Sequence, residues 1–152
     1  MTGNLKKGTK NMEQSTQASF QDHSKKFQKM VSRVERYGQL DNPDGYGKRT
    51  GNCGDTIEMY LSVQGGQIRM VTFQVQGCAN TVACGNTVSM LMEGRTLSDG
   101  WQLTPENVSD YLETLPADHF HCAELAVGAF YKALTNYNSN QKELWKKNYP
   151  QR

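Results

Sequence analysis

Two apolar–polar alternating stretches, separated by a glycine pair, constrain the fold of this chain most. From residue 57 to residue 63 every second residue is apolar, which is the period of a half-buried β-strand. A second run rich in apolar residues, predicted as the second strand, extends from about 68 to 75 after the glycines at 65–66. The two runs predict an antiparallel hairpin, and because a two-stranded ribbon is marginal alone, we expect a third strand within Tyr46–Asn52.

The phase of the two runs predicts the register of the hairpin. A two-residue turn at the glycine pair would point the apolar residues of the second strand away from the apolar face of the first. A three-residue loop over 64–66 instead pairs Met59 with Val71 and Ile57 with Phe73. We therefore predict that loop, with one glycine in the left-handed conformation.

Segments with helical spacing lie on both sides of the hairpin. The first has Phe27, Met30, Val31 and Val34 on one face, and the others carry start or stop signals such as Asn80, Gly94 and Thr104-Pro105. The expected helices run from Ser24, as N-cap, to Tyr37, from Thr81 to Glu93, from Pro105 to the stop at Leu115-Pro116, and from His121 to Tyr137. The order predicts an α+β fold, a small antiparallel sheet of about three strands with helices packed on one face.

Composition changes at both ends of the chain. Residues 1–22 are rich in Lys, Gln, Ser, Thr and Asn and read as a disordered tail. Residues 23–138 are then expected to form one domain with its own core. Residues 139–152 form a polar tail that we expect to be partly helical around Leu144 and Trp145.

Charge and hydropathy exclude several classes of protein. The net charge of +2 is too small to indicate binding to nucleic acid or to a membrane surface. No apolar run is long enough to span a bilayer, and the first residues contain no apolar core of a secretory signal. We therefore expect a cytoplasmic protein, in which four cysteines favour metal or thiol chemistry over disulfides.

Candidate ligands stand at the ends of the predicted elements. Cys53 and Asp55 lie on a glycine-flanked loop before the first strand, Cys78 lies between strand and helix, and His121-Cys122 open the last helix. Helix N-termini favour the thiolate form of Cys78 and Cys122. Thiolates with an imidazole or a carboxylate form a sulfur-rich site that suits zinc or an iron–sulfur cluster.

Each candidate also has a simpler interpretation. Cys84 falls about one turn into the 81–93 helix and is best explained as a buried small side chain, although a disulfide with Cys78 can form on oxidation. Asp55 also fits ordinary turn chemistry. His121 could cap its helix or pack under the hairpin, and the neighbouring His119 is at most a reserve ligand.

The order and spacing of these motifs resemble the NifU/IscU-type iron–sulfur cluster assembly scaffolds over roughly residues 25–137. The matching motifs are an Asn-Pro turn, Cys53-Gly54-Asp55, a hairpin ending in Gly77-Cys78, and Leu-Pro shortly before His121-Cys122. The resemblance implies that a 2Fe–2S cluster is assembled at a site made of Cys53, Asp55, Cys78, His121 and Cys122.

The resemblance also implies partners. The family receives sulfur as persulfide from a cysteine desulfurase, with Cys122 at the position of the usual acceptor, passes clusters to apo-acceptor proteins, and is not itself an enzyme. A cluster shared in a homodimer is compatible with the sequence. Family members that use a dedicated Hsp70-type chaperone resemble Leu-Pro-Pro-Val-Lys before His-Cys, whereas residues 115–119 read Leu-Pro-Ala-Asp-His, which argues against that partner.

Two other functions use the same residues. A structural or storage zinc protein would need the same cysteine, histidine and carboxylate ligands, and the sequence does not separate it from a scaffold. A thiol enzyme would need Cys122 and His121 as nucleophile and base, but adjacent helical residues point about 100° apart. The sequence therefore favours a metal site over nucleophilic catalysis.

Overall fold

The predicted hairpin consists of β2 (Thr56–Gln64) and β3 (Gln67–Gln76), joined by a two-residue turn. The predicted three-residue loop is wrong. Both turn residues, Gly65 and Gly66, have positive φ, at +60° and +77°. Two consecutive positive values are what the tight hairpin turn requires, and glycine adopts them without steric cost.

A β-bulge in β3 reconciles this short turn with the apolar phase of the two strands. The register skips Arg69, and beyond it Met59 pairs with Phe73 where we predicted Val71. Ile57 is displaced from its predicted partner by the same two residues. The extra residue restores the alternation, so the predicted faces are correct although the predicted partners are wrong.

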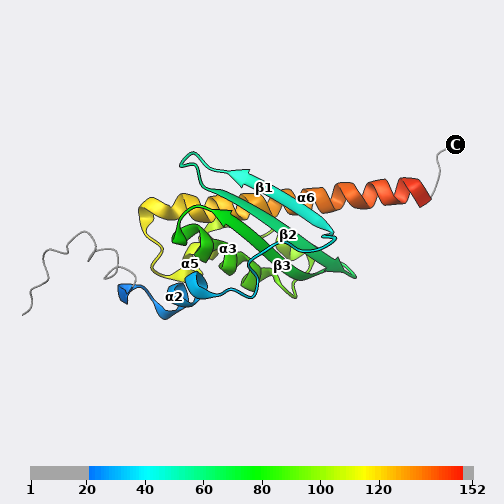
Figure 1. The fold of residues 1–152 in the computed structure, drawn as a ribbon. Helices are drawn as coiled ribbons and strands as arrows, with labels where there is room; N and C mark the ends of the chain where they lie inside the picture. The colour runs from blue at the N-terminus through cyan, green and yellow to red at the C-terminus, as the bar shows by residue number, and fades with distance from the viewer. Residues whose placement is uncertain (1–20, 149–152) are drawn as a thin grey trace, which may run out of the picture.

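The third strand, β1 (Gly45–Thr50), pairs antiparallel with β2 and gives the sheet the order β1-β2-β3. Figure 1 shows the sheet on one side of the molecule and the long helix α6 (Phe120–Asn148) running behind β1 and β2. The contact is close, because a Cβ at Gly47 would lie 2.3 Å from the carbonyl oxygen of Ala129. Glycine is therefore required where β1 crosses the helix.

The structure, a computed structural model, describes residues 21–148. The predicted disordered tail lies outside the described residues except for 21 and 22, which are helical. In this part of the chain the fold is α+β, as predicted. Its helices are α2 (Lys25–Ser32), α3 (Ala79–Met92), the short α4 (Leu97–Gly100), α5 (Pro105–Leu112), the 3-10 turn η1 (Ala117–His119) and α6.

The first helix is shorter than predicted. Ser24 caps α2 as expected, and its hydroxyl accepts a hydrogen bond from the backbone N–H of Phe27. The helix ends at Ser32 and not at Tyr37, because the amide of Asn86 on α3 binds the carbonyl of Arg33. Val34 consequently lies outside the helix and is 74% exposed, so its predicted inward position is wrong.

The later helices differ from prediction mainly at their ends. The helix α3 begins two residues early, with Cys78 and not Asn80 as N-cap, and Gly94 follows its C-cap with φ +87°. Thr104 caps α5 as predicted. The last helix continues to Asn148, so its predicted end at Tyr137 is wrong. No helix among residues 21–148 is long and apolar enough to cross a membrane.

Candidate metal centre

The loop 51–55 connects β1 to β2 and is closed by its own backbone. Gly54 donates to the carbonyl of Gly51 (3.0 Å), and Gly51 donates to the carbonyl of Asp55 (2.9 Å). Gly54 has φ +93°, a conformation that favours glycine. The turn leaves Cys53 exposed near its tip and places Asp55 at its base, directly before β2.

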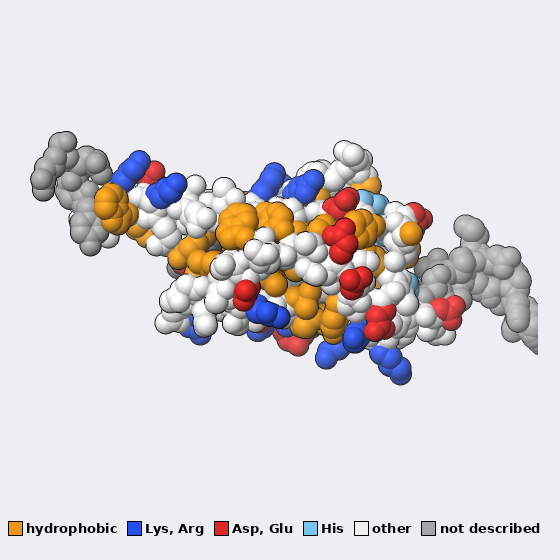
Figure 2. Space-filling view, turned by 180° about the vertical axis from the view of Figure 1, so that it is seen from behind, with side chains coloured by type: hydrophobic (Ala, Val, Ile, Leu, Met, Phe, Trp, Pro, Cys, Tyr) orange, Lys and Arg blue, Asp and Glu red, His pale blue; other side chains and the backbone are white. Residues whose placement is uncertain are grey.

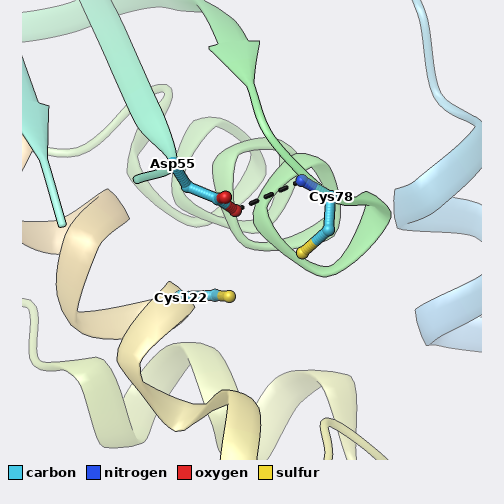
Figure 3. A group of neighbouring side chains, drawn as sticks. All are labelled: Asp55, Cys78 and Cys122. Carbon is cyan, nitrogen blue, oxygen red and sulfur yellow. Dashed lines mark hydrogen bonds between the residues drawn. The ribbon is translucent and has the colours of Figure 1, made fainter. Parts of the chain in front are cut away.

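The first turn of α3 fixes the Asp55 carboxylate. Oδ2 of Asp55 accepts hydrogen bonds from the backbone N–H of Cys78 (3.2 Å) and from the hydroxyl of Thr81 (2.8 Å). Figure 3 shows the first of these bonds across the gap between β2 and α3. Thr81 is fully buried and was not among the predicted site residues. Its position three residues after Cys78, on the same helical face, was the available signal.

Three predicted ligands converge from separate elements. Asp55 comes from the start of β2, Cys78 from the junction of β3 and α3, and Cys122 from the first turn of α6. Their ligand atoms all lie within 4.8 Å of one another. In Figure 3 both sulfur atoms and the carboxylate point into the same space. Two soft thiols and one carboxylate oxygen are donors that zinc and iron accept.

The other two predicted ligands lie beside this group. Cys53 and His121 line a groove of about 510 Å³ between the 51–55 loop and the start of α6. Nε2 of His121 lies 3.7 Å from Sγ of Cys122. The sequence argument that these neighbours diverge is therefore wrong, because the imidazole is long enough to reach back to the adjacent thiol.

Hydrogen bonds keep the Asp55 carboxylate ionised. Burial raises the pKa of Asp55, but the hydrogen bonds donated by Thr81 and by Cys78 outweigh burial, and the thiol of Cys53 acts in the same direction. The pKa of this carboxyl therefore lies below its ordinary value. Asp55 consequently presents a negative charge to any cation that enters the group.

Cys122 behaves differently from the prediction of a helix-stabilised thiolate. Burial raises the pKa of Cys122 to about 12; a hydrogen bond from Thr81 offsets part of this rise, while Cys78 and Asp55 add to it. The side chain is fully buried and belongs to the third residue of α6. Desolvation and neighbouring negative groups thus exceed the effect of the helix terminus.

Cys84 has the buried position that the sequence predicted. It is a free cysteine with no exposed surface, and burial raises its pKa well above the ordinary value. Cys122 and Cys78 add to that rise, so Cys84 lies near the candidate centre. It is not among the three residues whose ligand atoms converge.

Gly77 offers a direct test of how Asp55 is positioned. A Cβ at Gly77 would lie 2.4 Å from Cγ of Asp55, so we expect Gly77→Ala to displace the carboxylate and weaken zinc binding on the order of tenfold. Gly51→Ala is the matched control, because its nearest contact would be an ordinary 3.6 Å to Leu125. Competition with a chromophoric chelator measures both affinities, and equal losses in the two variants would contradict this role of Gly77.

The fold and the converging donors together define a class of protein: small α+β domains that gather thiols and a carboxylate at one end of an antiparallel sheet. Residues 23–144 match the family model described as the NifU-like N terminal domain. This chain therefore belongs to the NifU-like N-terminal domain family, as its motifs indicated.

A curated relative is similar to this chain in sequence, and two solved structures are similar to it in fold. Iron-sulfur cluster assembly scaffold protein IscU 1 of Archaeoglobus fulgidus is 31% identical over 102 residues, which cover 66% of each chain, just under two thirds. A NifU-like protein (N-terminal) from Brucella abortus has a similar fold, with a TM-score of 0.62, 19% identity, and coverage of 76% of this chain and 94% of that one. A candidate SUF-system scaffold from Fervidobacterium islandicum also has a similar fold, with a TM-score of 0.63 and 18% identity. The match covers 74% of this chain and 96% of that one.

Proposed function

We propose that this protein is a scaffold on which a 2Fe–2S cluster is assembled and from which the cluster is transferred to apo-acceptor proteins. The observation that carries the proposal is the convergence of Asp55, Cys78 and Cys122 within 4.8 Å. A permanent cluster is normally held by four thiolates. Here two thiols meet one carboxylate, which is a harder and poorer ligand for cluster iron than a thiolate.

Cys53 and His121 complete the proposed ligand set. Both line the same groove, and they come from the 51–55 loop and the start of α6, the two segments that also carry Asp55 and Cys122. The proposed cargo thus includes iron, with Zn²⁺ as a competing ion for the same donors.

Cys122 is the proposed acceptor of sulfur from a cysteine desulfurase. Its thiolate would attack the outer sulfur of the donor's persulfide, so that a new sulfur–sulfur bond forms at Cys122 and the desulfurase thiolate leaves. The thiol must first lose its proton, and the pKa of about 12 makes this unfavourable without help. His121, with Nε2 at 3.7 Å, is placed to take that proton.

A protein that assembles clusters in this way needs partner proteins, but it does not convert a substrate catalytically. We propose that it acts in the cytoplasm with a cysteine desulfurase and with apo-acceptor proteins, as a scaffold and not as an enzyme. Residues 115–119 lack the second proline and the lysine of the chaperone-recognition pattern, which argues against a dedicated Hsp70-type chaperone.

Anaerobic reconstitution tests this function and separates it from a zinc protein. The metal-free protein is mixed with ferrous iron, cysteine and a cysteine desulfurase, then with an apo-ferredoxin. We expect the visible absorption and Mössbauer spectrum of a 2Fe–2S cluster, followed by its appearance in the ferredoxin. If the protein binds zinc but forms no cluster, the zinc-storage function is correct instead. A cluster that forms but is never released would contradict the proposed transfer.

A further inference from the structure

The two edges of the sheet differ in how far the fold covers them. Along β3, the backbone N–H of Val71 donates to the Glu93 carboxylate (3.0 Å), and Phe73 donates to the carbonyl of Arg36 (3.1 Å). The hydroxyl of Tyr37 binds both backbone groups of Val75, and residues 94–97 cover the start of the strand. This edge is therefore closed to another strand.

The edge of β1 is covered only at its beginning. The N–H of Tyr46 points away from β2 and donates to Oδ1 of Asn136 on α6 (2.9 Å), whereas Gly51 donates inward to the carbonyl of Asp55. Because backbone direction alternates along a strand, Lys48 and Thr50 share the outward phase of Tyr46. Within residues 21–148, their outward N–H and C=O groups have no hydrogen-bond partner.

This open edge leads into the candidate metal centre. Figure 1 shows β1 as the outermost strand, running into the loop before β2. Arg49 and Thr50 belong both to the strand and to the wall of the groove that contains Cys53 and His121. A segment bound along the edge would therefore lie beside the groove that contains Cys53 and His121.

The charge around the edge favours an acidic occupant. Lys48 and Arg49 are exposed on β1, and Lys132 of α6 lies close to Gly47 with its side chain also exposed. Figure 2 shows Lys and Arg side chains along this rim of the molecule, with Asp and Glu side chains beside them and His side chains beyond. A second copy pairing through β1 would set these cations against each other, which is unfavourable for directly opposed strands.

We propose that the free edge of β1, residues 48–50, binds an extended acidic segment of a partner protein as a fourth strand of the sheet. Main-chain hydrogen bonds to Lys48 and Thr50 would supply much of the affinity, and the flanking cations would select acidic side chains. The edge is outside the proposed ligand set, so its binding can be tested on metal-free protein and fails or succeeds independently of cluster assembly.

Synthetic peptides test the proposal in solution. The probe is a short peptide that alternates glutamate and valine; its controls carry lysine in place of glutamate, or methyl groups on all backbone amides. Amide chemical shifts and hydrogen exchange locate the bound peptide, and titration gives its affinity. We expect shifts and protection at Lys48 and Thr50, and binding about tenfold weaker for both control peptides.

Two variants of Lys48 distinguish the contribution of its backbone N–H to peptide binding from the contribution of its side-chain charge. Lys48→Pro removes an outward N–H without touching the β1–β2 ladder, whose donors lie at the alternate positions, and should weaken binding of the acidic peptide about tenfold. Lys48→Gln keeps the N–H and should cost only a few-fold, with a reduced dependence on salt. Circular dichroism confirms that each variant is folded.

Several results would overturn the proposal. They are the absence of binding by the acidic peptide, binding that ignores both Lys48→Pro and amide methylation, and shifts that map away from residues 48–50. Sedimentation at increasing protein concentration provides a further test, because it detects dimers. A dimer that disappears in Lys48→Pro would show that a second copy, and not an acidic segment, occupies the edge.

Discussion

We expect Cys122→Ser to abolish formation of the cluster and Cys84→Ser to leave it intact. The two cysteines are a matched pair, because both are fully buried and burial raises the pKa of both. Only Cys122 has its sulfur within 4.8 Å of the ligand atoms of Asp55 and Cys78. Serine keeps the size of the side chain but offers iron a hard oxygen in place of a soft sulfur.

Absorption and Mössbauer spectra after anaerobic reconstitution measure this difference. We expect no 2Fe–2S signal in Cys122→Ser and a signal close to that of the unmodified protein in Cys84→Ser. Thermal unfolding of the metal-free variants controls for simple loss of the fold. A cluster that survives in Cys122→Ser but is lost in Cys84→Ser would reverse the assignment of the two thiols.

We expect the zinc affinity of the metal-free protein to rise steeply with pH. The pKa of Cys122 is about 12, so this thiol is protonated at neutral pH and must release its proton when it binds a metal. Release of the Cys122 proton alone contributes a factor of about ten per pH unit to the association constant, in addition to the protons released by the other thiol ligands, as long as the pH stays below that pKa. Raising the pH therefore strengthens binding, and acid weakens it.

Competition with a chromophoric chelator between about pH 6 and pH 8 measures the slope of this dependence. In Cys122→Ser the affinity is lower at every pH, and the slope falls by about one proton because the serine hydroxyl does not ionise in this range. Equal slopes for the two proteins would mean that Cys122 does not ligate the ion.

Local pattern predicted much of the fold, but contacts between distant segments decided its details. The alternation over 57–63 gave the faces of the hairpin correctly, because one face must be buried whatever the register. The phase conflict with a two-residue turn was the local signal of the bulge at Arg69, but a longer loop explains that conflict equally well, and the bulge changed every pair beyond it. The helix α2 ends early because Asn86, which lies 53 residues from Arg33, binds its carbonyl.

The same distinction applies to the candidate site. Residues at element ends were found from their type and position, and Asp55, Cys78 and Cys122 do meet. Thr81 was missed because its role depends on Asp55, 26 residues away in sequence. The predicted thiolate form of Cys122 was wrong, because the burial of this side chain depends on the packing of α6. A helix boundary in the sequence does not reveal that packing.

The central claim is that this centre binds its cluster weakly enough to release it. The most direct test is the rate at which the Asp55→Ala variant transfers its cluster to an apo-ferredoxin. The account predicts that the variant assembles a 2Fe–2S cluster, retains it longer, and transfers it on the order of tenfold more slowly than the unmodified protein. Asp118→Ala, which removes a carboxylate that is 84% exposed, should transfer at the normal rate. A transfer rate unchanged in Asp55→Ala would contradict the account.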